Sequence, residues 1–178
     1  SWPSGKELFQ HLECNPYLFL PIQFDHLGCF NEAQNLLDQF VEHRKYDQES
    51  NTEGKWKSLA INGLGGDSRK TQNHLDYGVN EPTYQLTEIA SRCPKTIEFL
   101  NQITDISKCE RIRFMLLEPG AKIKVHSDAV DKDVTLAVNI ALNMPTGCDF
   151  WTDLGAQGEK TLFSQKIPIK DGSVFLFN

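Results

Sequence analysis

His126 and Asp128 are the two residues of this chain whose types and spacing best fit a chemical site. They stand two positions apart, and side chains at positions i and i+2 of a strand share one face. An imidazole nitrogen and a carboxylate oxygen are two of the three protein ligands in the 2-His-1-carboxylate site of non-haem Fe(II) oxygenases, which leaves positions open for a co-substrate and dioxygen. If a strand continues through the triplet, the pair is a candidate iron site.

The same triplet has a plainer interpretation, as a turn in which Asp128 accepts hydrogen bonds from backbone amides and His126 is solvated. Its surroundings favour the metal, because it lies between apolar runs of strand character in a β-rich second half. Metal sites are commonly built inside jelly rolls and cupins of this kind. A second pair with the same spacing, His74 and Asp76, lies in a polar stretch and is interpreted as a surface turn.

Strands and turns dominate the second half of the chain. Apolar runs and turn signals such as Pro119-Gly120 and Asp171-Gly172 predict strands over 111–117, 122–126, 134–142, 148–152, 161–168 and 173–177. In 134–142 one face is small and polar and includes Asn139. Such a face suits the wall of a cavity that holds a polar ligand, or equally a surface that meets water.

The first half is predicted to be helical and irregular. Helical spacing predicts helices over 6–12, over 30–44 with Asn31 as N-cap, and over 85–103 with a break at Pro94. We expect an extended edge segment over 17–24, a strand over 57–64, and loops over 45–55 and 67–82. The fold class is therefore mainly β with N-terminal helices (α+β), as one domain over 1–178: helical or irregular to 107, β-strands from 111.

Composition excludes several function classes. The net charge is −6 and no block of Lys or Arg occurs, which argues against a nucleic acid or an anionic membrane surface as partner. Neither a run of membrane-spanning length nor a signal peptide is visible in the sequence. The 5 cysteines are scattered without metal-ligand spacing, which favours free thiols in a reducing compartment, so we expect a cytoplasmic protein.

Four stretches together resemble the aspartyl/asparaginyl β-hydroxylase family: Cys93-Pro94-Lys95-Thr96, 111–117, Glu118-Pro119-Gly120 and His126-Ser127-Asp128. Its members are 2-oxoglutarate- and Fe(II)-dependent dioxygenases, and bacterial proline cis-hydroxylases belong to the same wider group. The resemblance is clearest over 93–142 and returns at 171–178. It implies a double-stranded β-helix, the cupin-like jelly roll, with His126 and Asp128 holding Fe(II) at one open end.

The resemblance also implies a second histidine ligand soon after strand 173–177, then an arginine that pairs with the far carboxylate of 2-oxoglutarate. Both positions would lie beyond Asn178, so we expect the chain to be a piece of a longer family member. Asn139 matches a polar position directed at 2-oxoglutarate. Met115 stands at another such position but cannot donate a hydrogen bond. Arg113, on the same face, is a second candidate for the co-substrate carboxylate, or else an exposed strand arginine.

The sequence thus predicts a hydroxylase that uses Fe(II) and 2-oxoglutarate on a small-molecule amino acid or an Asp-, Asn- or Pro-type residue of a peptide. Two alternatives stay open. One is a non-enzymatic jelly roll that binds a small ligand beside a degenerate metal site. The other is a cupin-type metalloenzyme that needs no 2-oxoglutarate. The sequence does not identify the substrate.

Overall fold

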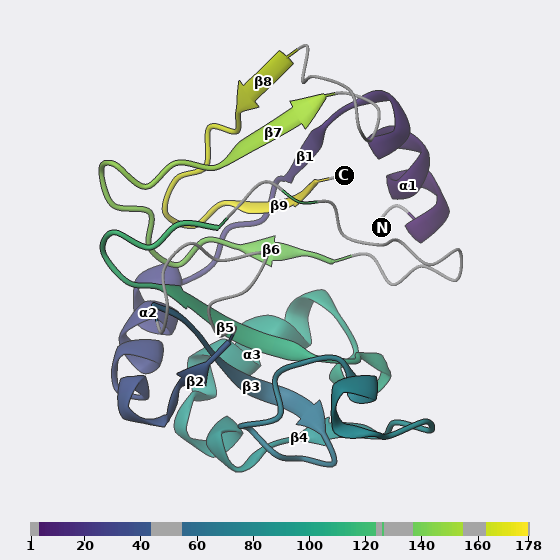
Figure 1. Ribbon diagram of the computed structural model, residues 1–178, viewed down its shortest axis with the longest axis vertical. Coiled ribbons are helices and arrows are strands. Elements are labelled where there is room, and N and C mark those ends of the chain that lie inside the picture. Colours follow the sequence, from purple (N-terminus) through teal and green to yellow (C-terminus); the bar gives the residue numbers. More distant parts are fainter. Residues whose placement is uncertain (1–3, 44–54, 124–125, 127–136, 155–162, 178) are drawn as a thin grey trace. The chain divides into compact units, whose positions relative to one another are not determined.

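The structure, a computed structural model, describes residues 4–43, 55–123, 126, 137–154 and 163–177. The chain divides into two compact units (Figure 1). Unit 1 comprises Ser1–Leu27 and Val130–Asn178, and unit 2 comprises Gly28–Ala129. The single domain expected over 1–178 stays a prediction.

Unit 1 is built on two small antiparallel sheets. Its elements are α1 (Gly5–Cys14), β1 (Tyr17–Leu20), β6 (Asn139–Ile140), β7 (Trp151–Leu154), β8 (Phe163–Lys166) and β9 (Val174–Phe177). One sheet has the order β1-β9-β6, and β7 pairs with β8 in the other. The strand β1 therefore lies at a sheet edge, as the sequence predicted for this segment. The helix α1 begins with a capping box, in which Ser4 and Glu7 each bond the other's backbone amide.

The sheet β1-β9-β6 has an aromatic face. Directly paired residues of an antiparallel sheet share a face, and Phe175 lies between Phe19 on β1 and Asn139 on β6. The rings of Phe19 and Phe175 lie 6.0 Å apart, and Phe150 lies 6.1 Å from Phe175. Leu176, which alternates to the opposite face of β9, is fully buried. Both faces of this sheet thus contribute to the core of unit 1.

Unit 2 is organised around one long strand. Its elements are α2 (His26–Gln34, which starts at the end of unit 1), η1 (Leu37–Gln39), β2 (Val41–Glu42), β3 (Trp56–Leu64), η2 (His74–Tyr77), β4 (Tyr84–Leu86), η3 (Glu88–Arg92), α3 (Pro94–Ile103), η4 (Ile106–Lys108) and β5 (Ile112–Leu117). β3 pairs antiparallel with β2, β4 and β5.

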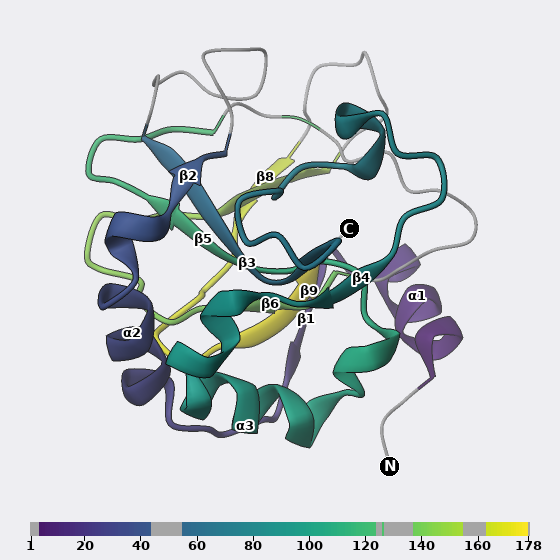
Figure 2. The same ribbon diagram turned by 90° about the horizontal axis from the view of Figure 1, so that it is seen from below.

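The strand β3 is buried on both faces. All of its residues except Lys57 are buried, although their sequence alternates between apolar and small polar side chains. Figure 2 shows the reason: α3 lies on one side of the sheet, and the segment between β3 and β4 lies on the other. Gly65 and Gly66, with φ of 60° and 74°, turn the chain out of the strand, as predicted.

The start of α3 is fixed by a carboxylate from α2. Glu32 accepts hydrogen bonds from the amides of Lys95 and Thr96 at 3.0 and 2.8 Å, and from the Thr96 hydroxyl at 2.8 Å. An anion is stabilised there by the unpaired amides and the dipole of the helix N-terminus. Pro94, the first residue of α3, has no amide that needs a partner.

Two predicted helices were partly wrong. The helix expected over 30–44 begins earlier and ends at Gln34, with Asn31 inside it rather than at its cap. Its expected second half forms η1 and then β2, because Val41 pairs with Ser58 of β3. The helix expected over 85–103 does break at Pro94, but β4 and η3 replace its first half. Strand pairing outweighed helical spacing in both places.

The predicted β-rich second half is confirmed. Strands occur within or overlapping the expected ranges 111–117, 134–142, 148–152, 161–168 and 173–177. The loop 45–55 falls mostly outside the described residues. Of the strand expected over 122–126, Lys122 and His126 are irregular, Ile123 makes an isolated bridge, and residues 124 and 125 lie outside the described residues. The protein is thus mainly β with a few short helices. Among the described residues, every helix is too short or too polar to span a bilayer.

Candidate functional site

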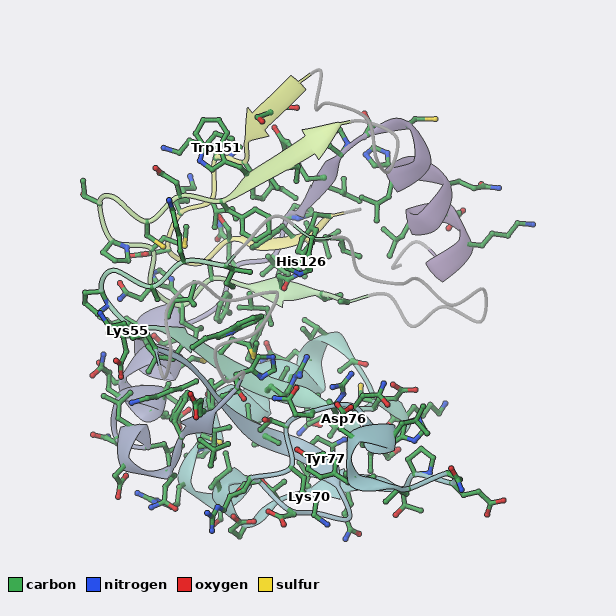
Figure 3. All side chains as sticks on the ribbon, viewed as in Figure 1. Lys55, Lys70, Asp76, Tyr77, His126 and Trp151 are labelled. Atoms are coloured by element: carbon green, nitrogen blue, oxygen red, sulfur yellow. The ribbon has the colours of Figure 1, made fainter. Side chains whose placement is uncertain are left out.

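The structure describes one of the two predicted metal ligands. His126 is described and exposed, whereas Asp128 lies outside the described residues (Figure 3). Within the described part of the chain, no three His, Cys, Asp or Glu side chains group closely enough to hold a metal. This absence does not test the pair, because Asp128 is not among the described residues. The assignment of His126 and Asp128 as ligands therefore stays a prediction.

Asn139 presents a buried hydrogen-bond donor. Its side-chain Nδ2 is buried and has no hydrogen-bond partner among the described residues. It shares the aromatic face of unit 1 with Phe175, which is 5 % exposed. An amide nitrogen left unpaired in apolar surroundings costs about 1–3 kcal/mol. Buried polar groups of this kind call for a partner, and a carboxylate oxygen is a suitable acceptor.

Arg113 is bound to the segment that covers β3. Its Nη1 donates to the backbone carbonyl of Thr71 at 2.6 Å, and Nη1 of Arg111 donates to the same oxygen at 3.4 Å. Arg113 is half-buried rather than fully exposed, so it is not a plain surface arginine. Met115, next on the same face, is 46 % exposed. Whether Arg113 meets 2-oxoglutarate stays a prediction.

A buried polar cluster adjoins this face, and sequence reasoning missed it. The ring of His43 lies 4.5 Å from that of Trp56, and its Nδ1 lies 2.9 Å from the Ser58 hydroxyl. Gln72 donates to the backbone carbonyl of His43. His43 is only 7 % exposed and Ser58 is fully buried. The one signal in the sequence was the small polar face of strand 57–64, whose partners lie far away along the chain.

The segment between β3 and β4 is held to the sheet at several points. The backbone amide of Gln72 donates to the Tyr77 hydroxyl at 3.1 Å, and this bond helps to fix the position of the segment. Lys70 lies over the Tyr77 ring at 5.8 Å, and Figure 3 shows the two close together. His74 lies in the turn η2, where its Nδ1 donates to the carbonyl of Val79 at 2.6 Å. The interpretation of His74 and Asp76 as a turn is therefore confirmed.

Two groups of unit 2 have shifted pKa values. Burial raises the pKa of the Cys93 thiol to about 12, and the charges of Glu32 and Cys29 add to the effect. Burial also raises the pKa of Tyr84, helped by the nearby Glu110 carboxylate and opposed by Arg111. Cys93 is therefore a neutral thiol at physiological pH, which suits a core residue rather than a nucleophile.

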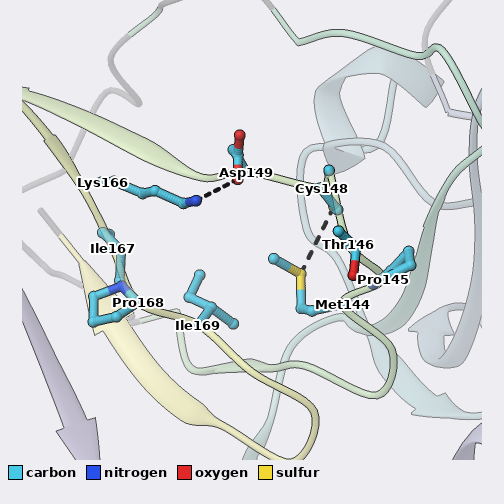
Figure 4. Close-up of a pocket in the computed structure, with 10 residues that line it drawn as sticks. Met144, Pro145, Thr146, Cys148, Asp149, Lys166, Ile167, Pro168 and Ile169 are labelled. Carbon is cyan, nitrogen blue, oxygen red and sulfur yellow. Dashed lines mark hydrogen bonds and ion pairs between the residues drawn. The ribbon is translucent and has the colours of Figure 1, made fainter.

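A hollow of about 520 Å³ lies in unit 1, away from the predicted ligands in sequence (Figure 4). Residues 144–149 and 166–169 line it. Lys166 and Asp149 form an ion pair of 2.7 Å across it, and the Cys148 thiol lies 3.8 Å from the Met144 sulfur. Its lining contains none of the predicted site residues, and it is open and partly apolar, so it carries no role in the site.

The comparison with known protein families identifies the family of this chain, which the geometry of the described residues does not. The family model for aspartyl/asparaginyl beta-hydroxylase matches residues 29–177, well over half of the chain. The chain therefore belongs to that family of hydroxylases, as the resemblance predicted. No curated protein and no solved structure matches it.

Proposed function

We propose that this protein is a 2-oxoglutarate- and Fe(II)-dependent dioxygenase that hydroxylates an amino acid or an Asp-, Asn- or Pro-type residue. Membership of the hydroxylase family supports the reaction type. The sequence His126-Ser127-Asp128 supports the metal, because an imidazole and a carboxylate are ligands that Fe(II) accepts. The jelly-roll fold, with the site at its open end, is part of the same proposal.

The single structural observation that carries the proposal is Nδ2 of Asn139, which is buried and has no hydrogen-bond partner within the part of the chain that the structure describes. This donor fits one carboxylate of 2-oxoglutarate, which offers only acceptors. The aromatic side chains on the same face keep water away from that hydrogen bond. A hydrogen bond to a charged acceptor in a dry environment is stronger than one in water.

In the proposed reaction the chain binds, orients and shields, and the metal supplies the difficult chemistry. Fe(II), when bound, activates dioxygen at the expense of 2-oxoglutarate, so that a C–H bond of the substrate can be hydroxylated. His126 would offer a neutral imidazole nitrogen and Asp128 a carboxylate oxygen. Asn139 would donate an N–H to the co-substrate and fix its orientation.

Titration with Mn(II), followed by a succinate assay with Fe(II), tests the metal assignment. The protein is compared with its His126→Ala and Asp128→Ala variants. We expect each to lower metal affinity about tenfold or more and to abolish succinate formation. Matched controls are His11→Ala and Asp38→Ala, which remove the same groups from exposed positions. Metal affinity equal in wild type and Asp128→Ala would reject the site.

The same assays separate the alternatives. Metal binding that is intact while 2-oxoglutarate does not bind would favour a cupin-type metalloenzyme. Binding of 2-oxoglutarate without succinate formation, across amino acids and peptides, would favour a non-enzymatic ligand-binding protein.

A further inference from the structure

Two sulfur atoms of unit 1 meet on the wall of the hollow in Figure 4. The Cys148 thiol lies 3.8 Å from the thioether sulfur of Met144, and the dashed line between them marks this contact. Both residues line the hollow, whose volume is about 520 Å³. Spacing among the cysteines and histidines does not reveal the pair, because its second member is a methionine.

The turn that carries the two sulfurs is fixed by hydrogen bonds. The amide of Cys148 donates to the carbonyl of Pro145 at 3.0 Å, and Gly147 between them has a φ of 88°, which glycine adopts without strain. The amide of Met144 donates to the carboxylate of Asp171 at 2.6 Å. The backbone of both sulfur residues is therefore fixed in advance, which lowers the ordering cost of binding a ligand between them.

The surroundings of the two sulfurs admit a cation. The ammonium group that lines the hollow, on Lys166, forms an ion pair of 2.7 Å with Asp149, so its charge is largely compensated. The carboxylate of Asp171 adds negative charge beside Met144. Cys148 is exposed and Met144 is half-buried, so an ion can reach both sulfurs through the hollow.

The chemistry of the pair selects a soft ion. Thiolate and thioether sulfurs favour Cu(I), whereas Mg(II) and Mn(II) prefer oxygen ligands. Structural zinc sites take four protein ligands, and this pair supplies two. A metal–thiolate bond is about 2.3 Å long, so two sulfurs bound to one ion lie up to about 4.6 Å apart. The observed separation of 3.8 Å is within that reach.

We propose that Met144 and Cys148 form a binding site for Cu(I). The ion replaces the thiol proton that Cys148 now directs at the Met144 sulfur. Cys148 supplies a thiolate and releases that proton to solvent, Met144 supplies a neutral thioether, and nothing is oxidised or reduced. A small soft ligand from solvent, such as a thiol, can complete the coordination from the hollow. The inference is independent of the proposed function, because it uses none of the proposed iron or co-substrate residues.

Titration with Cu(I) tests the site on the reduced full chain, without oxygen and in competition with a chromophoric Cu(I) chelator. Wild type is compared with Cys148→Ser and with Met144→Leu, a substitution that nearly keeps the side-chain volume. The matched controls are Cys14→Ser, which removes another exposed thiol of unit 1, and Met115→Leu, which removes the other methionine from an exposed position.

We expect Cys148→Ser and Met144→Leu each to weaken the tightest Cu(I) site about tenfold or more, and both controls to bind as wild type does. Affinity equal to that of wild type in either Cys148→Ser or Met144→Leu would overturn the proposal. In particular, a loss in Cys148→Ser alone would show that the thiol binds the ion without the methionine.

X-ray absorption at the copper edge provides a second readout, which a merely structural role of Met144 would not change. The chain has 2 methionines, so selenomethionine-labelled Met115→Leu carries selenium at position 144 alone. We expect copper to have a selenium neighbour in Met115→Leu and none in Met144→Leu. Copper without a selenium neighbour in Met115→Leu would overturn the proposal. So would a loss of Cu(I) affinity in His126→Ala, because the ion would then occupy the proposed iron site.

Discussion

Two strand asparagines, Asn62 in unit 2 and Asn139 in unit 1, have opposite surroundings. Nδ2 of Asn62 donates to the carbonyls of Cys109 and Glu110, at 3.2 and 2.7 Å, and the residue is 1 % exposed. Nδ2 of Asn139 is also buried, but it has no partner among the described residues. A satisfied buried amide stabilises its own fold, whereas an unsatisfied one is a cost that a ligand can remove.

The two units also differ in how exposed their cysteines are. Cys14 and Cys148 of unit 1 are exposed, whereas Cys29 and Cys93 of unit 2 are buried. Cys29, Cys93 and Asn62 thus lie in the core of unit 2, although Cys109 of the same unit is half-buried. The comparison indicates that these buried groups of unit 2 contribute to the stability of its core, and five experiments can break or sharpen it.

Thiol labelling should give the largest contrast. In native protein we expect Cys29 and Cys93 to react with a disulfide reagent about a thousandfold more slowly than Cys14 and Cys148, because they require an opening of the core. Mass spectrometry of timed samples measures the four rates. Comparable rates for all four would show that unit 2 opens as readily as unit 1.

The raised pKa of Cys93 predicts that the stability of the protein depends on pH. Its thiol has a pKa of about 12 in the folded state, against 9.0 for an unperturbed cysteine. A folded pKa above the unfolded one means that the stability it contributes is fully present below about pH 9. That stability is lost as the pH rises from 9 toward 12. Urea unfolding of wild type and Cys93→Ala should therefore show a steeper alkaline loss for wild type.

Asn62→Leu should cost the most stability. The substitution removes the donor of two carbonyls in a buried site, and we expect a loss of about 3 kcal/mol in the free energy of unfolding. Urea denaturation measures it. Asn101→Leu, at an exposed position of α3, is the control and should stay within about 0.5 kcal/mol. A loss as small as the control's would mean that the bonds of Asn62 contribute little.

Asn139→Leu should change the stability little and weaken the binding of 2-oxoglutarate. We expect the free energy of unfolding to stay within about 1 kcal/mol of wild type, because no bond among the described residues is lost and an unpaired donor is removed. Affinity for 2-oxoglutarate should fall about tenfold, measured by titration in the presence of Mn(II). If this variant unfolds as easily as Asn62→Leu, Asn139 has a structural partner in the protein and its assignment to the co-substrate is wrong.

Ser4→Ala should have the smallest effect. It removes the hydroxyl that accepts the Glu7 amide at 3.2 Å at the start of α1. We expect a loss of about 1 kcal/mol or less. Hydrogen exchange of the first amides of α1 measures it, and their protection should fall while that of β3 does not. Unchanged protection at Glu7 would show that the capping box is not formed in solution.

Some of this structure follows from local sequence. The strand 57–64 ends at Gly65 and Gly66 because both adopt positive φ, and the break at Pro94 follows from the missing amide of proline. The β-rich second half follows from alternation and turn residues. The family follows from the stretches that surround His126.

Contacts between distant residues decided the rest. Val41 left the predicted helix because Ser58 offered it a strand partner, and residues 85–86 left theirs for β3. Thr71 and Arg113 meet across 42 positions of sequence, which no local pattern encodes. The same holds for His43 and Ser58.

The sequence by itself determined the donor types, the strand periods, the turns and the family of this protein. The tertiary structure alone decided which distant groups the donors of the described residues meet. The physical reason is that hydrogen-bond satisfaction and charge pairing depend on distances in space. The local sequence determines the hydrophobic period and the secondary-structure propensity of a segment. It does not determine which distant group a side chain of that segment contacts.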